Sequence, residues 1–246
     1  MPFASGSTVT PVSAGWRYVG FEVLKLGAGA RLSRQAGSDE HCLVAVAGHM
    51  RVNGWELGGR ATPFDGPPHA AYLAPGTGWE LEALSDLELA VCTAPAREGA
   101  ESRPLRDPRF EARGSGPTAR RIHHILMEEQ PAERLLVTEV VTPGGNWSSY
   151  PPHKHDTEDP PGEAYLEETY YHRFLRPEGF GIQRVYTADR ALDEALVVKD
   201  GDIVLVPRGY HPVAAAAGYD LYYLNVMAGP NRRWLVRWEP AHEWLR

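Results

Sequence analysis

Residues 143–156 read PGGNWSSYPPHKHD and hold the most informative pattern of the 246-residue chain, two histidines separated by one residue. Pro151 and Pro152 disfavour a helix here, because proline lacks the N–H that a helix interior requires. Side chains at i and i+2 of a strand point to the same face, so His153 and His155 can reach one metal ion. The stretch therefore predicts a strand that presents two imidazoles together.

Further metal donors occur in the same half of the chain. Glu168 begins a β-rich segment with Thr-Tyr-Tyr, and His211 lies just beyond the apolar run 203–206. Glu167 is the alternative to Glu168 as the carboxylate. Three imidazoles and one carboxylate suit one divalent ion such as Zn, Mn, Fe, Co or Ni, without fixing which. An isolated pair of histidines more often consists of surface residues that bind no metal, but the accompanying donors favour a metal site.

The rest of the chain has the composition of an all-β protein. Glycine and proline together make up 46 of 246 residues (25 plus 21), which is high for a helical protein because both disfavour helix interiors. Short apolar runs separated by turn residues predict the strands of a sandwich or barrel. These runs are 18–24, 42–46, 87–91, 135–141, 169–171, 203–206 and 221–224. Residues 191–198 are expected to form a short helix.

The pattern divides the chain into two similar halves. We expect an N-terminal domain over 1–94, a Pro- and Gly-rich linker over 95–119 and a C-terminal domain over 120–246. A weak internal repeat supports two copies of one barrel, because Trp79 follows Pro75 by four residues as His211 follows Pro207. No HxH pattern precedes Trp79, so the first barrel is expected to be metal-free.

Charge and segment lengths limit the partners that we expect. The net charge is −7 and no basic run occurs, which argues against nucleic acid. No apolar run is long enough to cross a bilayer, and the N-terminus lacks the pattern of a signal peptide. With only two cysteines, we expect a cytoplasmic protein with reduced thiols. Because the net negative charge of the chain repels anions, an anionic substrate would need a local pocket of positive charge.

At the level of motifs, the order Gly, HxH, Glu, then Gly-x5-Pro-x-Gly-x-His resembles the cupin superfamily. Longer strings resemble the 5-deoxy-glucuronate isomerases of inositol catabolism. These are residues 143–156, 165–173, 183–187, 206–213 and 222–230. One departure from the general cupin pattern is that twelve residues, 156–167, separate His155 from Glu168, so a loop beside the site is expected.

The resemblance implies two tandem cupin barrels, a bicupin of jelly-roll type, with the metal in the second barrel on His153, His155, Glu168 and His211. It also implies an aldose–ketose isomerase that converts 5-deoxy-D-glucuronate to 5-dehydro-2-deoxy-D-gluconate. The hydrogen moves from C2 to C1 through a cis-enediol or as a hydride. In either route the metal would stabilise charge on the substrate oxygens.

Strand alternation extends the expected site. If Glu168 points inward, so do Tyr170 and His172, and Tyr223 shares one face with Asn225. We expect Tyr170, His172 and Tyr223 to line the site as candidate proton carriers. For the substrate carboxylate a guanidinium is favoured, with Arg184 as the candidate and Arg173 and Arg208 as rivals. Further substrate-binding residues expected in the family-like strings are Gln183, Tyr186 and Asn225.

Two other functions fit the same features. A cupin dioxygenase that uses Fe(II) would have similar ligands, and oxygen uptake would reveal it. A non-catalytic sugar-acid-binding cupin would bind its small-molecule ligand without forming product. The sequence leaves the oligomeric state open, with a homo-oligomer as one possibility.

Overall fold

The computed structural model describes residues 3–4 and 8–246, which form two compact units. The unit that we call N-terminal comprises residues 8–109 and 123–138. The C-terminal unit comprises Phe110–Ile122 and Glu139–Arg246, together with strand β1. The described helical segments are short: α1 (Pro11–Ala14), η1 (Gly116–Thr118) and η2 (Pro240–Leu245). All other described elements are strands, which confirms the expected all-β class.

The N-terminal unit consists of two sheets that share the long strand β5, and its core lies between them. Trp79, the residue that takes the place of His211 in the internal repeat, is buried in this apolar core. The strands are β2 (Thr8–Val9), β3 (Gly20–Leu26), β4 (Arg31–Arg34), β5 (Asp39–Val52), β6 (Trp55–Arg60), β7 (His69–Leu73), β8 (Trp79–Ala83), β9 (Leu87–Pro95) and β10 (Arg103–Leu105).

Strand β5 belongs to both sheets because its pairing shifts near Gly48. Gly48 has φ +92°, and a Cβ added there would lie 2.1 Å from the carbonyl oxygen of Asp86. The register between β5 and β6 shifts at this point, which is the behaviour of a β-bulge. Only glycine combines this backbone conformation with so close a neighbour, so Gly48 permits the bend.

A buried carboxylate fastens β5 to residues 133–135 within the N-terminal unit. Glu40 is 0% exposed and accepts hydrogen bonds from the backbone N–H groups of Glu133 (2.9 Å), Arg134 (2.7 Å) and Leu135 (2.7 Å). The Tyr72 hydroxyl donates a fourth bond of 2.7 Å. Hydrogen bonds to an ionised acceptor are stronger than neutral ones, so four donors compensate much of the cost of burying this charge.

We expect Glu40→Ala to lower the free energy of unfolding by about 3 kcal/mol, because two buried and two partly buried donors lose their acceptor. Urea denaturation followed by circular dichroism measures this change. Glu101→Ala, which removes an exposed carboxylate of the same unit, serves as the control and should change stability by less than about 0.5 kcal/mol. Equal stabilities of the two variants would contradict the role assigned to Glu40.

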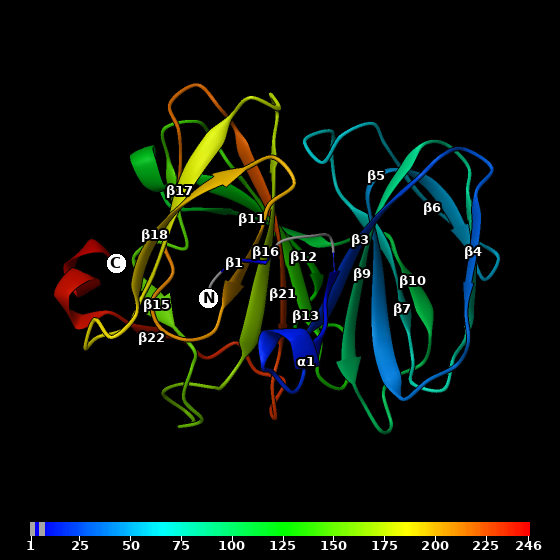
Figure 1. Ribbon diagram of the computed structural model, residues 1–246, viewed down its shortest axis with the longest axis horizontal. Coiled ribbons are helices and arrows are strands. Elements are labelled where there is room, and N and C mark those ends of the chain that lie inside the picture. Colours follow the sequence, from blue (N-terminus) through cyan, green and yellow to red (C-terminus); the bar gives the residue numbers. More distant parts are fainter. Residues whose placement is uncertain (1–2, 5–7) are drawn as a thin grey trace. The chain divides into compact units, whose positions relative to one another are not determined.

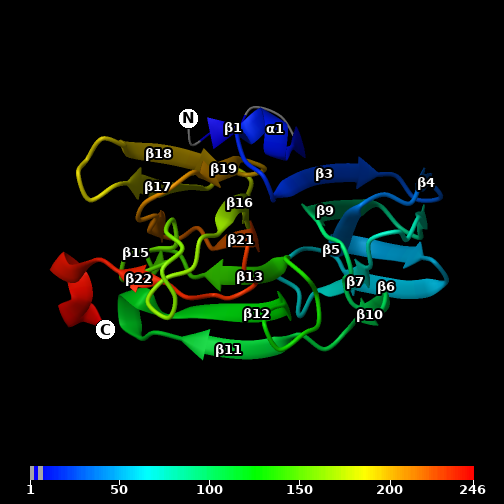
Figure 2. The ribbon, with the colours of Figure 1, turned by 90° about the horizontal axis from the view of Figure 1, so that it is seen from below.

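The C-terminal unit contains a seven-stranded sheet ordered β1-β19-β16-β21-β13-β12-β11 and a four-stranded sheet ordered β14-β20-β17-β18. Figure 2 shows β11, β12 and β13 side by side. The strands are β1 (Phe3–Ala4), β11 (Arg109–Arg113), β12 (Arg120–Leu126), β13 (Leu136–Thr142), β14 (Trp147–Ser148), β15 (His153–Lys154), β16 (Glu167–Phe174), β17 (Phe180–Tyr186), β18 (Asp193–Lys199), β19 (Ile203–Val206), β20 (Val213–Ala215), β21 (Leu221–Ala228) and β22 (Arg237–Trp238).

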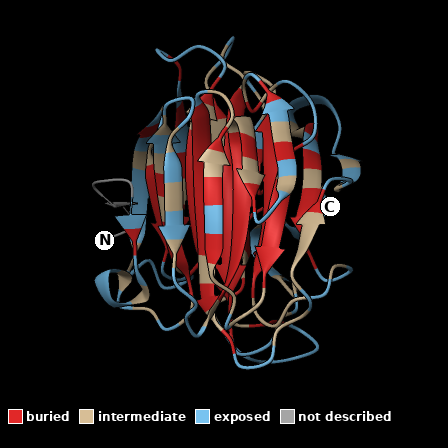
Figure 3. Ribbon diagram, turned by 90° about the vertical axis from the view of Figure 1, so that its right-hand side faces the viewer, coloured by how far each residue is buried: buried red, intermediate tan, exposed pale blue. Residues whose placement is uncertain are grey.

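One apolar cluster joins the two sheets of the C-terminal unit. Ile122, Tyr170 and Tyr223 come from the larger sheet, and Val185 and Val213 come from the smaller one. Each strand contributes the side chains of one face, as strand alternation requires. Figure 3 shows the buried residues concentrated along the strands and the exposed ones mainly in the connections. The interior between the two sheets is therefore the only place where inward residues of both can meet.

One local expectation differs from the structure. Residues 193–199 form strand β18 rather than a helix, because they pair residue by residue with β17, its neighbour in Figure 1. Sheet pairing here overrides a weak local helix preference. The stretch 95–119, expected as a linker, contains the short strands β10 and β11, and β10 pairs with β7. In the described part of the chain, no helix has the length and apolar character needed to span a membrane.

Candidate active site

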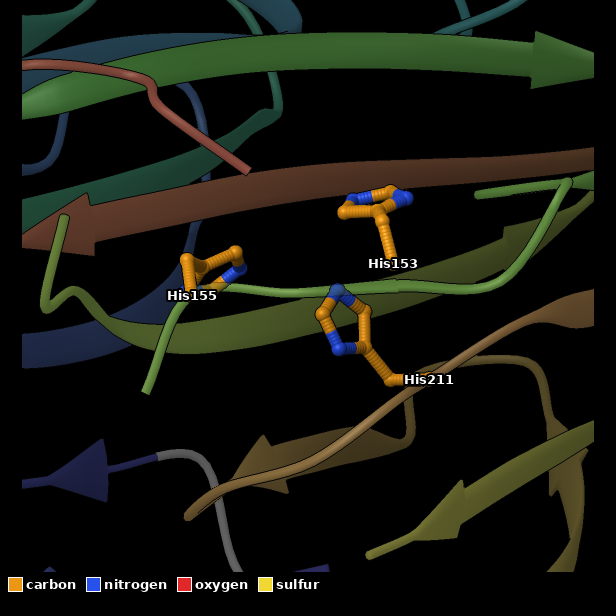
Figure 4. A group of neighbouring side chains, drawn as sticks. All are labelled: His153, His155 and His211. Atoms are coloured by element: carbon orange, nitrogen blue, oxygen red, sulfur yellow. The ribbon is translucent and has the colours of Figure 1, made fainter. Parts of the chain in front are cut away.

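The HxH stretch lies in the C-terminal unit, where it begins as strand β15 and pairs with β22. His153 and His155 are 7% and 2% exposed, and Figure 4 shows their rings grouped with that of His211. Lys154 points away, because its ammonium group pairs with Asp156 (2.5 Å) and Glu163 (2.8 Å). The i, i+2 argument from the sequence thus agrees with the observed directions.

His211 reaches the same point from the turn after β19. A hydrogen bond of 2.9 Å joins its Nδ1 to the carbonyl oxygen of Gly209, and one of 3.0 Å joins the Nδ1 of His155 to the carbonyl oxygen of Leu166. A carbonyl only accepts, so each Nδ1 carries a proton, and the Nε2 of His211, which makes no hydrogen bond, keeps its lone pair. Metal-binding histidines are commonly oriented by hydrogen bonds of this type.

Glu168 places its carboxylate between two of these imidazoles. Its Oε2 lies 3.0 Å from the Nε2 of His155 and 3.2 Å from the Nε2 of His211. Glu167, its neighbour on β16, accepts instead from the Tyr165 hydroxyl at 3.4 Å. Since adjacent strand residues point to opposite faces, only one of the two glutamates can belong to the histidine group, and the geometry favours Glu168.

The three histidines form a group that could hold a metal ion, with one nitrogen of each within 4.8 Å of the others. Burial lowers the pKa of both His153 and His211 to about 3, so these rings are neutral at pH 7 and available as ligands. For His155, burial acts in the same direction, but the hydrogen bond and charge of Glu168 outweigh it and raise the pKa. A buried carboxylate oxygen beside the Nε2 atoms of two imidazoles is an arrangement that a cation can hold together.

The three expected proton carriers lie together next to the histidine group. The Tyr170 ring is 5.8 Å from that of His211, 5.0 Å from that of Tyr223 and 5.9 Å from that of His172. Burial raises the pKa of both tyrosines, so each keeps its hydroxyl proton at neutral pH. Burial lowers the pKa of His172 to about 4, so this ring is neutral. Asn225 is the partner of Tyr170 across β16 and β21.

The expected substrate-binding residues on β17 separate onto two faces. Gln183 is buried and its Oε1 lies 2.9 Å from the Nε2 of His172, so it belongs with the inward group. Arg184 instead forms two contacts of 2.7 Å with Asp193, and its side chain is 42% exposed. Tyr186 bonds to Glu239 on that outer side. The structure does not bring Arg184 and Tyr186 to the histidine group.

The two rivals of Arg184 also lie outside the group. Arg173 pairs with Asp200 at 2.8 Å, and Arg208 is exposed. The general preference of arginine for surface ion pairs explains both positions.

Several residues that the sequence did not single out surround the site. The hydroxyls of Ser148 and Ser149 bond to those of Tyr223 and Tyr170, the second pair at 2.8 Å. The rings of Trp238 and Trp234 lie 5.3 and 5.9 Å from the ring of His153. The serines stand within the string that suggested the family, but the tryptophans lie about 80 residues further on, and only strand pairing between β15 and β22 connects Trp238 with His153.

Residues 4–245 match the family model described as the KduI/IolB family. A 5-deoxy-glucuronate isomerase of Geobacillus thermodenitrificans is 54% identical over 245 residues, covering 96% of this chain and 89% of the relative. The 5-deoxy-glucuronate isomerase of Bacillus subtilis strain 168 is 42% identical over 246 residues, covering 96% and 91%.

Solved structures show the same likeness. A crystal structure of an IolB-like protein from Salmonella typhimurium has a TM-score of 0.94 and 47% identity, covering 98% of this chain and 96% of that one. An oxalate decarboxylase of Lactobacillus farciminis has a TM-score of 0.63 at 11% identity, covering 96% and 85%. At that identity the likeness concerns the fold alone, and it confirms the expected cupin fold.

Proposed function

The chain belongs to the KduI/IolB family, and from this premise we propose that it isomerises 5-deoxy-glucuronate to the corresponding ketose acid with one divalent metal ion. We propose His153, His155, His211 and Glu168 as the metal ligands. The observation that carries the proposal is the convergence of three buried imidazoles and one carboxylate beside a group of tyrosines. The names of the close relatives supply the substrate.

The donor set fits a divalent ion on the evidence of its hydrogen bonds. The Nε2 of His211 is buried and makes no hydrogen bond, although the Oε2 of Glu168 is only 3.2 Å away. With the Nδ1 proton of His211 used on Gly209, two lone pairs face each other, which a cation would turn into an attraction. When bound, the ion supplies Lewis-acid stabilisation of the charge that grows on the oxygens at C1 and C2.

The remaining inward residues handle protons and orientation in this proposal. His172 donates through Nε2 to Gln183, so its unprotonated Nδ1, which is buried and makes no hydrogen bond, can accept a proton. Tyr170 and Tyr223 keep their protons and act as hydrogen-bond donors to substrate oxygens. The serines that bond to their hydroxyls fix the direction of both rings. Burial excludes water, which strengthens each of these interactions.

We place the reaction in the cytoplasm. Cys42 and Cys92 are free and buried, as expected of a protein in a reducing compartment.

The test is proton NMR of the metal-loaded protein with 5-deoxy-glucuronate in D2O. We expect the aldehyde signal to disappear and the signals of the keto acid to grow, without oxygen consumption at an oxygen electrode. Deuterium at C1 of the product would indicate a proton transfer through the enediol, and retained hydrogen would leave a hydride shift or a proton transfer shielded from solvent. Absence of conversion with Zn, Mn, Fe, Co and Ni would overturn the proposal, and oxygen uptake would favour a dioxygenase.

A further inference from the structure

Arg120 stands out in the C-terminal unit, because it is the one buried arginine among that unit's described residues. It is 8% exposed and begins strand β12, two residues before Ile122. Residues at i and i+2 share a face, and Ile122 packs into the interior cluster that contains Tyr170 and Tyr223. Arg120 therefore points toward the same interior as the tyrosines of the candidate site.

Among the described residues no carboxylate forms an ion pair with the guanidinium of Arg120, although the charge of Glu111 acts on it from a distance. The guanidinium donates to the carbonyl oxygens of Thr118 (2.9 Å) and Tyr150 (3.3 Å). An arginine has five N–H donors, so these two bonds leave part of its capacity unused. Other arginines of this unit do have carboxylate partners, including Arg113 with Glu111, Arg173 with Asp200, Arg184 with Asp193 and Arg237 with Glu163.

A buried positive charge without a counter-ion is costly, because neutral carbonyls replace only part of its hydration. The charge of Arg120 also acts inside the candidate site. Burial raises the pKa of Tyr223, and Arg120 is the first influence that opposes this rise. Tyr223 and Tyr170 are in turn among the groups that act on Arg120, so its charge lies close to both tyrosines.

We infer that Arg120 binds the carboxylate of the sugar-acid substrate and so determines both its affinity and its orientation. This inference rests on the proposed isomerase function. A planar guanidinium can hold a carboxylate through two parallel hydrogen bonds, which fixes direction as well as distance. The carboxylate and the aldehyde stand at opposite ends of the substrate, so an anchor at Arg120 directs C1 and C2 toward the histidine group. In a chain of net charge −7, this residue supplies the local positive site that an anion needs.

The test compares 5-deoxy-glucuronate with its C6 primary amide, which lacks the negative charge. For Arg120→Met we expect kcat/KM for the carboxylate substrate to fall on the order of 100-fold, mainly through KM. The same variant should convert the amide about as well as the unmodified protein does. Arg120→Lys, which keeps the charge without the planar fork, should show an intermediate loss. Arg121→Met, on the exposed face of the same strand, is the matched control and should leave kcat/KM unchanged for both substrates.

The comparison of substrates separates binding of the carboxylate from a structural role. Equal losses for the acid and the amide would overturn the inference, as would an unchanged KM in Arg120→Met or a 100-fold loss that appears in Arg184→Met instead. Metal content and thermal melting identify a variant that fails to fold, and Arg120→Lys then carries the test by the same acid-to-amide ratio. If the unmodified protein converts neither compound, the proposed function fails. If the unmodified protein converts the acid and Arg120→Met has the same kcat/KM, only the inference about Arg120 is rejected.

Discussion

Replacing His211 by alanine is expected to lower kcat/KM for 5-deoxy-glucuronate on the order of 10³-fold and to remove most of the bound metal. The substitution deletes one of three converging imidazoles and leaves the Oε2 of Glu168 with a single imidazole partner, His155. No other side chain can take its place as a ligand, because the ring of His211 is 1% exposed and is enclosed by the other two histidines and Tyr170. NMR assays of turnover test the loss of activity, and plasma mass spectrometry tests the loss of bound metal.

The control for this prediction is His49→Ala, which removes a half-buried histidine of the N-terminal unit and should retain both metal and activity. Dialysis of the unmodified protein against a chelator should reproduce the His211→Ala behaviour, and addition of metal should restore activity only in the unmodified protein. Full activity in metal-free protein would show that the histidine group serves another purpose.

The parts of the site that strand periodicity governs were predictable from the sequence. Alternation places His153 and His155 on one face, and it separates Glu168 from Glu167 once one of them faces the histidines. The same rule, applied along the strand from Glu168, predicted that Tyr170 and His172 point to the same face, and their rings lie 5.9 Å apart. Such inferences need only local geometry, because the period of a strand does not depend on what surrounds it.

The parts that depend on pairing between distant strands were not predictable. Alternation shows that Gln183 and Arg184 point to opposite faces, but only the pairing of β17 with β20 and β18 decides that Gln183 is the inward one. The polar partners of Arg120 are backbone carbonyls, one of them 30 residues away, and no side-chain pattern marks them. Residues 191–198 were wrongly expected as a helix for the same reason, since pairing with β17 makes 193–199 a strand.

The insert between His155 and Glu168 shows how a loop absent from the general cupin pattern is held in place. Glu163, in the middle of this insert, is 0% exposed and accepts from the backbone N–H groups of Asp156 (2.8 Å) and Thr157 (3.0 Å). It also pairs with Lys154 (2.8 Å) and Arg237 (3.0 Å). One carboxylate therefore connects the insert to the HxH stretch and to strand β22.

Asp156 extends this network to the segment that carries His211, because its Oδ2 accepts the backbone N–H of Gly209 at 2.7 Å. Gly209 in turn accepts from the Nδ1 of His211. A chain of hydrogen bonds thus runs from Glu163 through Asp156 and Gly209 to a proposed ligand. Groups that orient the ligands of a metal typically contribute 10- to 100-fold to its affinity, even though they do not touch the ion.

We therefore expect Glu163→Ala to lower the free energy of unfolding by about 4 kcal/mol and the metal affinity by roughly 10- to 100-fold. Two backbone N–H groups lose their acceptor, and Lys154 is left with Asp156 alone for charge compensation. Glu163→Gln preserves the shape but removes the charge, so its effects should be smaller and in the same direction. Urea denaturation and competition with a metal-binding dye measure the two quantities, with the exposed Glu178→Gln as control. If Glu163→Ala lost stability but bound metal as tightly as the control, the insert would support the fold without orienting the ligands, and the hydrogen-bond chain through Gly209 would have no part in the site.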